Sequence, residues 1–157
     1  MFVLSCGEDK SKKEESDQIK LGGKKEQVVK DDSKITINLT GNDLMQFNLK
    51  ELKVKAGQEV TINLRHVGKM DMQVMGHNFV LLKPGVDLQA FALAATEAGK
   101  DADWIPNDGA DVIAHTKMLG GGESDSVTFM APEAGTYEFL CSFTGHSALM
   151  KGTFTVE

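Results

Sequence analysis

The sequence predicts an all-β protein, a Greek-key β-sandwich or barrel that carries one short helical flap. Three features of the chain support this prediction. Apolar and polar residues alternate along several segments, those segments are rich in Val, Ile and Thr, and glycine or proline turns separate them. Seven or eight short strands divided by such turns are expected to pack as two facing sheets.

The expected strands begin at residue 35 and continue to the C-terminus. Between residues 79 and 82 the run is apolar throughout, and Pro84 and Gly85 end it. Residues 120–122 are all glycine and predict a turn. In chain order the expected strands cover residues 35–39, 47–54, 60–66, 79–82, 127–129, 137–141 and 153–156.

One segment breaks the two-residue period. Leu88, Phe91 and Ala95 recur at helical spacing within residues 86–98, which are rich in Ala, Leu and Glu. This spacing predicts a single amphipathic helix that ends near Gly99. Residues 104–106, with the sequence Trp-Ile-Pro, are expected to pack this helical segment down onto the sandwich.

The chain of 157 residues is long enough for one domain and a tail. Residues 7–33 hold fifteen charged side chains among twenty-seven, which predicts a disordered tether, and the domain is expected to cover residues 34–157. The net charge of −6, with one arginine among seventeen basic residues, does not indicate a nucleic-acid partner. No run of about eighteen apolar residues is present, so no segment is expected to span a membrane.

Residues 1–6 form a short apolar run that ends at Cys6. They resemble the end of a bacterial lipoprotein signal, in which the cysteine becomes the lipidated first residue after cleavage. The charged start and most of the apolar part of such a signal are missing, so an unmodified cysteine remains an alternative interpretation. A Cys6–Cys141 disulfide is a further alternative. We disfavour it because Cys141 is better explained as a metal ligand, as described below. We expect a periplasmic or cell-envelope protein, anchored in the membrane if Cys6 carries lipid.

A thiol, an imidazole and a thioether lie within ten residues near the C-terminus. Cys141, His146 and Met150 would share one loop between two adjacent strands. This donor set suits copper, because blue-copper sites combine two histidines, one cysteine and a weak axial methionine. The second histidine must come from elsewhere, and His77 is the best candidate. Gly145 lets the backbone turn before His146, and a helical turn would bring Met150 onto the same face.

The loop around Cys141 resembles the copper loop of the azurins, bacterial blue-copper proteins of the cupredoxin family. Five blocks occur in azurin order and at nearly azurin spacing: residues 41–47, 74–78, 112–117, 125–129 and 141–152. The resemblance implies a cupredoxin fold whose helical excursion lies outside the barrel. It also implies one type 1 copper ion bound by His77, Cys141, His146 and Met150.

The resemblance assigns roles to further residues around this site. The Gly76 carbonyl is implied as a distant fifth contact of the metal, although an ordinary turn is an alternative interpretation of this glycine. The backbone amides of Asn78 and Phe143 are implied to point at the cysteine sulfur and to tune the reduction potential. An exposed apolar surface for redox partners, here called the docking patch, is implied at Met45, Met70, Met75, Phe143 and Leu149.

The other two histidines are not expected to bind metal. His66 continues the inward face of residues 60–64 and matches a buried azurin histidine that is no ligand, whereas His115 is expected at the surface. Some positions depart from the azurin pattern. Phe79 replaces a buried tryptophan, Thr144 replaces a proline, and the N-terminal azurin disulfide has no counterpart here. These departures leave the reduction potential open.

The resemblance implies a small electron carrier, not an enzyme, in which copper alternates between Cu(I) and Cu(II). We expect a monomer whose partners are redox proteins such as c-type cytochromes or copper/haem oxidoreductases. A carrier or store for Cu(I) is the alternative function, because thioethers favour Cu(I) and four methionines surround the His77 motif. A metal-free interaction domain is a weaker alternative. A cysteine enzyme is disfavoured because a copper-bound Cys141 is not free and no residue stands out to orient His146.

Overall fold

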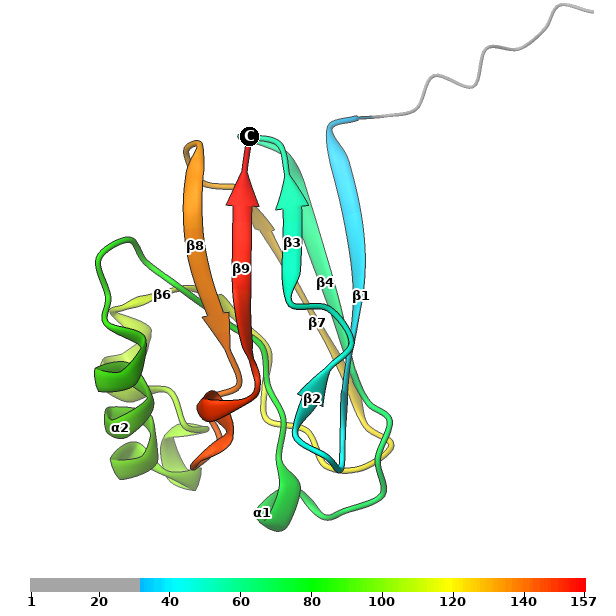
Figure 1. Ribbon diagram of the computed structural model, residues 1–157, viewed down its shortest axis with the longest axis vertical. Helices are drawn as coiled ribbons and strands as arrows, with labels where there is room; N and C mark the ends of the chain where they lie inside the picture. The colour runs from blue at the N-terminus through cyan, green and yellow to red at the C-terminus, as the bar shows by residue number, and fades with distance from the viewer. Residues whose placement is uncertain (1–31) are drawn as a thin grey trace, which may run out of the picture. The chain divides into compact units, whose positions relative to one another are not determined.

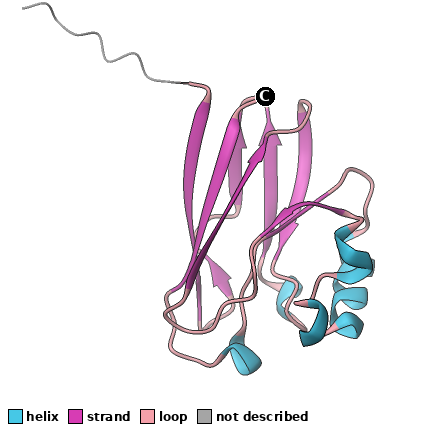
Figure 2. Cartoon of the chain, turned by 180° about the vertical axis from the view of Figure 1, so that it is seen from behind, coloured by secondary structure: helices cyan, strands magenta, loops and turns pink. Residues whose placement is uncertain are grey.

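The computed structural model describes residues 32–157, so the predictions for Cys6 and for residues 7–31 of the tether lie outside the described residues. The described part forms two sheets that lie one behind the other, with β8, β9 and β3 in front of β1, β4 and β7 in Figure 1. Figure 2 shows the same two layers from behind. The sheets do not close into a barrel, and the expected all-β sandwich is confirmed as an open one.

The first sheet has the strand order β2-β1-β4-β7. β1 and β4 run parallel, with Ile35 opposite Val60 and Leu39 opposite Leu64, whereas β4 and β7 are antiparallel. In β4 the alternating sequence buries every second side chain, as the two-residue period predicts, and in β7 the alternate side chains are half-buried. The strands are β1 (Lys34–Asn42), β2 (Gln46–Phe47), β4 (Glu59–His66) and β7 (Ser124–Met130).

The second sheet has the strand order β3-β9-β8-β5-β6. β5 lies between β8 and β6, and all three of its residues are buried, which explains its continuous apolar sequence. β8 and β9 pair antiparallel and form the hairpin that carries the Cys141 loop. The strands are β3 (Glu51–Val54), β5 (Val80–Leu82), β6 (Val112–His115), β8 (Gly135–Leu140) and β9 (Lys151–Val156).

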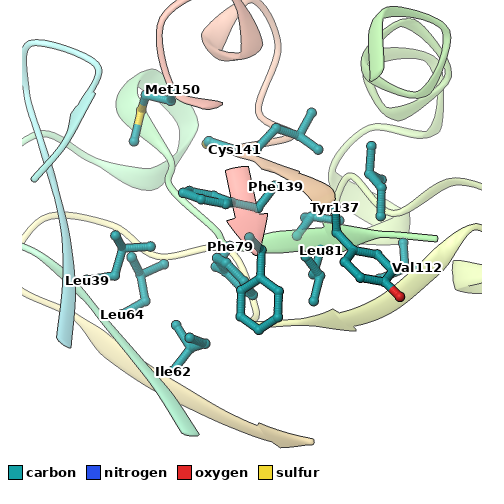
Figure 3. Close-up of a cluster of buried hydrophobic side chains, with 14 of the residues drawn as sticks. Leu39, Ile62, Leu64, Phe79, Leu81, Val112, Tyr137, Phe139, Cys141 and Met150 are labelled. Carbon is teal, nitrogen blue, oxygen red and sulfur yellow. The ribbon is translucent and has the colours of Figure 1, made fainter. Parts of the chain in front are cut away.

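The core lies between the two sheets (Figure 3). Leu39 and Ile62 project from the first sheet toward Phe79 and Phe139, and all four side chains are fully buried. Cys141 and Met150 lie at one edge of this cluster, so the candidate metal donors border the apolar core. The apolar packing therefore holds the base of the candidate site.

The helical segments lie toward the end of the sandwich opposite the C-terminus (Figure 2). α2 (Leu88–Ala98) begins at Asp87, whose side chain accepts a hydrogen bond from the Ala90 amide, and ends at Gly99 with a φ of 62°. Two 3₁₀ turns follow, Lys100–Ala102 and Pro106–Gly109. We call residues 86–111 the flap.

The predicted packing of the flap is confirmed, because Trp104 and Ile105 are each only 7% exposed. The sequence did not predict the two 3₁₀ turns of the flap, the strand β6 or the single turn α1 (Met72–Met75), which Asp71 caps. The expected strand at residues 47–54 is instead two short strands, β2 and β3. Within residues 32–157, no helix is long and apolar enough to cross a membrane.

Candidate metal centre

The Cys141 loop is a closed structure at the end of the β8–β9 hairpin. The Cys141 amide donates to the Met150 carbonyl at 2.9 Å, and the Met150 amide donates to the His146 carbonyl at 2.8 Å. A 3₁₀ turn at His146–Ala148 lies between them, and Gly145 enters it with a φ of 79°, which favours glycine. This tight fold brings residues five and nine positions after Cys141 back toward its side chain.

The structure brings His77, Cys141 and His146 into one buried group. Their donor atoms all lie within 4.8 Å of one another. The Cys141 Sγ is 3.9 Å from His77 Nδ1 and 3.6 Å from His146 Nδ1. His77 and Cys141 are fully buried, and His146 is 3% exposed. Two imidazole nitrogens and one sulfur at these separations can share a single metal ion.

Hydrogen bonding fixes which ring nitrogen of His77 is free. Its Nε2 lies 2.8 Å from the Asn42 carbonyl oxygen, and a carbonyl can only accept, so Nε2 carries the proton. The other nitrogen, Nδ1, therefore keeps its lone pair and faces Cys141. A protein partner on the remote nitrogen is the usual device that orients a metal-binding histidine.

Burial keeps the three donors neutral in the absence of a cation. It raises the pKa of the Cys141 thiol to about 12, against the opposing effect of hydrogen bonds from the Asn78 and Phe143 amides. Burial also lowers the pKa of His146 to about 4 and that of His77 below its ordinary value. A thiol with this pKa is no nucleophile at neutral pH, whereas a bound cation would displace its proton.

Met150 and two glycines complete the surroundings of the group. The Met150 side chain is fully buried, and its methyl carbon and the His77 ring both approach Gly41 closely. A Cβ on Gly41 would lie 2.7 Å from His77 Cδ2 and 3.2 Å from Met150 Cε. The Gly76 carbonyl accepts from Cys141 Sγ at 3.6 Å, so a backbone oxygen also faces the donors. The chain thus places a thioether and a carbonyl beside the three donors.

A buried polar pair ties the two donor segments together. The Asn78 side chain donates to Ser142 Oγ at 2.8 Å and accepts from the Ser142 amide at 2.8 Å. Asn78 follows His77, and Ser142 follows Cys141. The residues next to the two donors are therefore joined by two direct hydrogen bonds.

His66 lies behind His77 and takes no part in the donor group. Its ring stacks on the His77 ring at a centroid distance of 4.2 Å. Its Nε2 donates to the Met75 carbonyl at 2.7 Å, and its Nδ1 accepts from the Gly68 amide at 3.0 Å. It is a satisfied core histidine, as expected, and His115 is exposed, as expected.

The predicted docking patch is only partly exposed. Met70 and Leu149 are 44% and 54% exposed, Met45 and Met75 are half-buried, and Phe143 is 9% exposed. Leu44 and Val74 are two further exposed apolar residues in the azurin-like blocks at residues 41–47 and 74–78. The predicted docking patch did not include them.

Sequence reasoning missed an aromatic contact between the flap and the donor group. The Phe143 ring lies 4.6 Å from the His146 ring between centroids, and the Trp104 ring lies 5.1 Å from Phe143. Trp104 is thirty-nine positions before Phe143 in the chain. No local pattern signals a contact over this separation.

Comparisons with known proteins agree with this geometry. A family model described as copper binding proteins of the plastocyanin/azurin family matches residues 33–157. The chain is 47% identical to Azurin-1 from Alcaligenes xylosoxydans xylosoxydans over 121 residues, covering 74% of this chain and 93% of that protein. It is 44% identical to azurin from Pseudomonas aeruginosa over 126 residues, covering 78% of this chain and 84% of that protein.

Two solved structures resemble the fold closely. Reduced auracyanin from Roseiflexus castenholzii has a TM-score of 0.70 and 38% identity, covering 78% of this chain and 96% of that one. Auracyanin A from Chloroflexus aurantiacus, described as a "blue" copper protein, has a TM-score of 0.71 and 35% identity. That match covers 79% of this chain and 99% of auracyanin A.

Proposed function

The chain belongs to the plastocyanin/azurin family of copper-binding proteins and is a blue-copper electron-transfer protein, and we propose that His77, Cys141, His146 and Met150 bind its copper. One observation carries this assignment. Two imidazole nitrogens and one thiol sulfur, all buried, lie within 4.8 Å of one another, and the buried Met150 side chain and the His77 ring both lie against Gly41. Soft sulfur donors combined with imidazoles fit copper better than they fit magnesium or calcium.

The surrounding residues are arranged to hold these donors still. The Asn42 carbonyl orients His77, the Asn78–Ser142 pair joins the two donor segments, and the Gly76 carbonyl faces the group. We propose that the Asn78 and Phe143 amides donate to the Cys141 sulfur, in line with their lowering of the pKa of this thiol against the effect of burial. Hydrogen bonds of this kind stabilise a thiolate and so bear on the reduction potential. Bound copper supplies the one-electron chemistry by alternating between Cu(I) and Cu(II).

We propose that redox partners dock at the docking patch, with c-type cytochromes or copper/haem oxidoreductases as the partners. The exposed side chains of Met70 and Leu149 support this surface, and Leu44 and Val74 extend it. Small apolar contacts suit a carrier because weak redox encounters bury little area and dissociate quickly. The monomeric state remains part of this proposal.

The alternative function, a carrier or store for Cu(I), is not favoured by the similarity to azurins and auracyanins. The three donors are buried and neutral, which suits retention of one ion rather than its transfer to an acceptor. A non-enzymatic role fits the family, and the high pKa of Cys141 weighs against a cysteine nucleophile.

The visible and EPR spectra of purified protein after addition of Cu(II) test the assignment. We expect an intense blue band from charge transfer between the thiolate and copper, and narrow copper hyperfine splitting because the copper–thiolate bond spreads the unpaired electron onto sulfur. Cys141→Ser should abolish the band, and Cys6→Ser, which removes the other cysteine, should keep it. A blue Cys141→Ser protein, or a colourless wild type that still binds copper, would contradict the assignment.

The axial role of Met150 has its own test. Met150→Gln offers copper a harder oxygen donor, which favours Cu(II) over Cu(I). We therefore expect a lower reduction potential in voltammetry with copper still bound. An unchanged potential would mean that Met150 is not axial.

We also propose a periplasmic or cell-envelope location, with Cys6 as the attachment point of a lipid. The support is the sequence of residues 1–6 alone. Metabolic labelling of full-length protein with a radioactive fatty acid tests it. Label that depends on Cys6 would support the anchor, and equal labelling of a Cys6→Ser protein would reject it.

A further inference from the structure

An open hollow beside the candidate metal centre is lined by two methionines. Residues 69–73 form one wall of the hollow, and Gly120, Gly121 and Glu123 form the other. Met70 and Met72 both line it, although one residue separates them in the chain. The Met70 side chain is 44% exposed and that of Met72 is half-buried. Two thioether side chains therefore border one hollow that solvent can enter.

Backbone contacts fix the wall that carries the two methionines. The Met70 carbonyl accepts from the Gly121 amide at 2.8 Å, and the Met70 amide donates to the Asp43 carboxylate at 3.3 Å. Met72 packs directly on Gly120, where an added Cβ would lie 3.1 Å from the Met72 nitrogen and 3.3 Å from its Cβ. The two methionines are thus held at the hollow before any ligand binds.

The same two chain segments hold a proposed copper ligand. Met72 begins α1, which ends at Met75, two residues before His77. On the other wall, Leu119 precedes Gly120 and exchanges two backbone hydrogen bonds with His77, at 3.0 and 2.8 Å. α1 also lies at the end of the sandwich that carries the Cys141 loop (Figure 1). The hollow therefore adjoins the segment that positions His77.

The chemistry of the lining favours a soft monovalent cation. Thioethers select Cu(I) and suit Cu(II), magnesium or calcium poorly. Asp71 and Glu123 against Lys69 leave the lining with one net negative charge, which attracts a cation. Both carboxylates also shape the hollow, since Asp71 accepts from the Gln73 amide and Glu123 accepts from the Gly120 amide, each at 2.8 Å.

We propose that the hollow at Met70 and Met72 is a surface site for Cu(I), which receives the ion before it enters the buried centre. In the transfer, Cu(I) leaves the thioethers for the donor group, the Cys141 thiol proton passes to solvent, and no electron moves. An ion held beside the centre enters it as an intramolecular step, at a raised effective concentration. The transfer rests on the proposed function, because it requires copper at His77 and Cys141.

Methionine NMR tests the binding site. The chain has eight methionines, whose ε-methyl groups can be labelled with carbon-13. The protein is first loaded with one equivalent of Cu(I), and further Cu(I) is added without oxygen as its acetonitrile complex. We expect the second equivalent to shift the Met70 and Met72 methyl signals and the chelator bicinchoninate to reverse the shift. Met72→Leu, which keeps an apolar side chain but removes the sulfur, should abolish the shift at Met70.

Met130→Leu is the matched control. Met130 is 59% exposed, more than Met70, and lies opposite Glu59 at the start of β4, whereas His66 ends that strand beside the centre. Its methyl signal should not shift, and its replacement should leave the Met70 and Met72 shifts intact. Absent shifts, or shifts that follow exposure and include Met130, would overturn the proposal.

Loading kinetics test the transfer. Metal-free protein is mixed with Cu(I), excess bicinchoninate stops uptake at set times, and the blue absorbance after oxidation by ferricyanide counts the loaded centres. Met72→Leu should slow loading from Cu(I) severalfold, and Met130→Leu should not. Loading from Cu(II) should be unchanged in both variants, because thioethers do not favour Cu(II).

The two metal ions separate this role from a structural one. Equal slowing of Met72→Leu with Cu(I) and Cu(II), or no slowing with either, would mean that Met72 only packs against the glycine turn. That outcome in a protein with a normal final blue band rejects the transfer alone. A missing blue band in the fully loaded wild type rejects the proposed function instead.

Discussion

At the scale of single residues, burial determines what the donor group can do before a metal arrives. Cys141, His77 and His146 have almost no exposed surface, so charged forms of these side chains are unfavourable. The group therefore stays uncharged, with a free imidazole lone pair on His77 directed at the thiol. A cation that enters replaces the thiol proton and gains a thiolate ligand.

The buried His146 predicts that acid destabilises the metal-free protein. Its folded-state pKa is about 4, below the 6.5 of an exposed histidine, so the unfolded chain binds more protons between these values. The free energy of unfolding should therefore fall by about 2–3 kcal/mol between pH 7.5 and 4.5 through this group. Denaturant unfolding at both pH values measures the loss.

Carboxylates also titrate in this range, so the informative quantity is a difference between variants. His146→Gln should remove the His146 share of the loss, and His115→Gln, which alters an exposed histidine, should keep it. The same pH dependence in the wild type and in His146→Gln would show that His146 is not held neutral by the fold.

Gly41 is the residue at which an added methyl group should do the most local damage to the site. A Cβ there would lie 2.7 Å from His77 Cδ2, and Asn42, which orients His77, is the next residue. We expect Gly41→Ala to displace the His77 ring, to alter the copper spectrum and to cost about 1–3 kcal/mol of stability.

Chemical unfolding and the visible spectrum measure both effects of Gly41→Ala. Gly135→Ala is the matched control, because its nearest contact would be an ordinary one of 3.6 Å to Tyr137. A Gly41→Ala protein with an unchanged spectrum would show that the His77 ring has room to move.

At the scale of elements, the site depends on two segments that are far apart in sequence. His77 lies just before β5, and the Cys141 loop joins β8 to β9. β5 and β8 are neighbours in the second sheet, with Val80 opposite Leu140, so strand pairing aligns the two segments. The Asn78–Ser142 hydrogen bonds then fix their register at the donors.

Removing the Asn78 side chain should loosen both segments together. Asn78→Ala would leave the Ser142 amide and hydroxyl without their buried partner, and each unsatisfied group costs about 1–3 kcal/mol. We expect a loss of about 2–4 kcal/mol in denaturant unfolding and a broader copper EPR signal. The EPR effect separates loosening of the site from a simple loss of stability.

Asn48→Ala is a matched control for this pair. Asn48 also makes two side-chain hydrogen bonds to the backbone, but at an exposed position where water can replace them. We expect a loss of about 1 kcal/mol or less and an unchanged EPR signal. Equal losses from the two variants would mean that burial of the Asn78 pair contributes nothing.

The sequence predicted those elements whose local pattern is strong. Alternation placed β1 and β4, and helical spacing at residues 86–98 predicted α2, observed at Leu88–Ala98. It could not predict the parallel pairing of β1 with β4, because pairing depends on contacts across the whole chain. Short elements such as α1, which is a single capped turn, carry too few residues to show a period.

Some contacts of the candidate site could likewise be predicted from the sequence, and others could not. The Cys141–Met150 spacing pointed to a metal loop because both ends lie in one short segment, and the His77 motif supplied the remaining donor. The contact of Trp104 with Phe143 comes from the flap packing against the loop. Such packing joins residues without a common motif, so only the structure reveals it.

At the scale of the whole molecule, the described domain forms the site from its own packing. The apolar core reaches Cys141 and Met150, and the strands on either side of the loop, β8 and β9, pair with each other along their whole length. A site that exists before the metal binds needs little rearrangement, which also suits fast electron exchange.

This preformed site predicts that metal stabilises a domain that is already folded. A ligand that binds only the folded state adds about 4 kcal/mol when its concentration is a thousand times the dissociation constant. We expect Zn(II), which is redox-inert and accepts the same sulfur and nitrogen donors, to raise the unfolding midpoint of the metal-free protein. The near-ultraviolet circular dichroism of the metal-free protein should already show fixed tertiary packing.

The stabilisation by Zn(II) should be lost when one of the metal donors is replaced and kept when a residue outside the site is replaced. Cys141→Ser should remove most of the gain from Zn(II), whereas the control Cys6→Ser should keep it. Hydrogen exchange should slow mainly in β8 and β9, because the loop that closes on the ion joins these two strands. A metal-free protein without fixed packing, or slowing spread evenly over both sheets, would mean that the metal organises the fold rather than occupying a site that the fold has built.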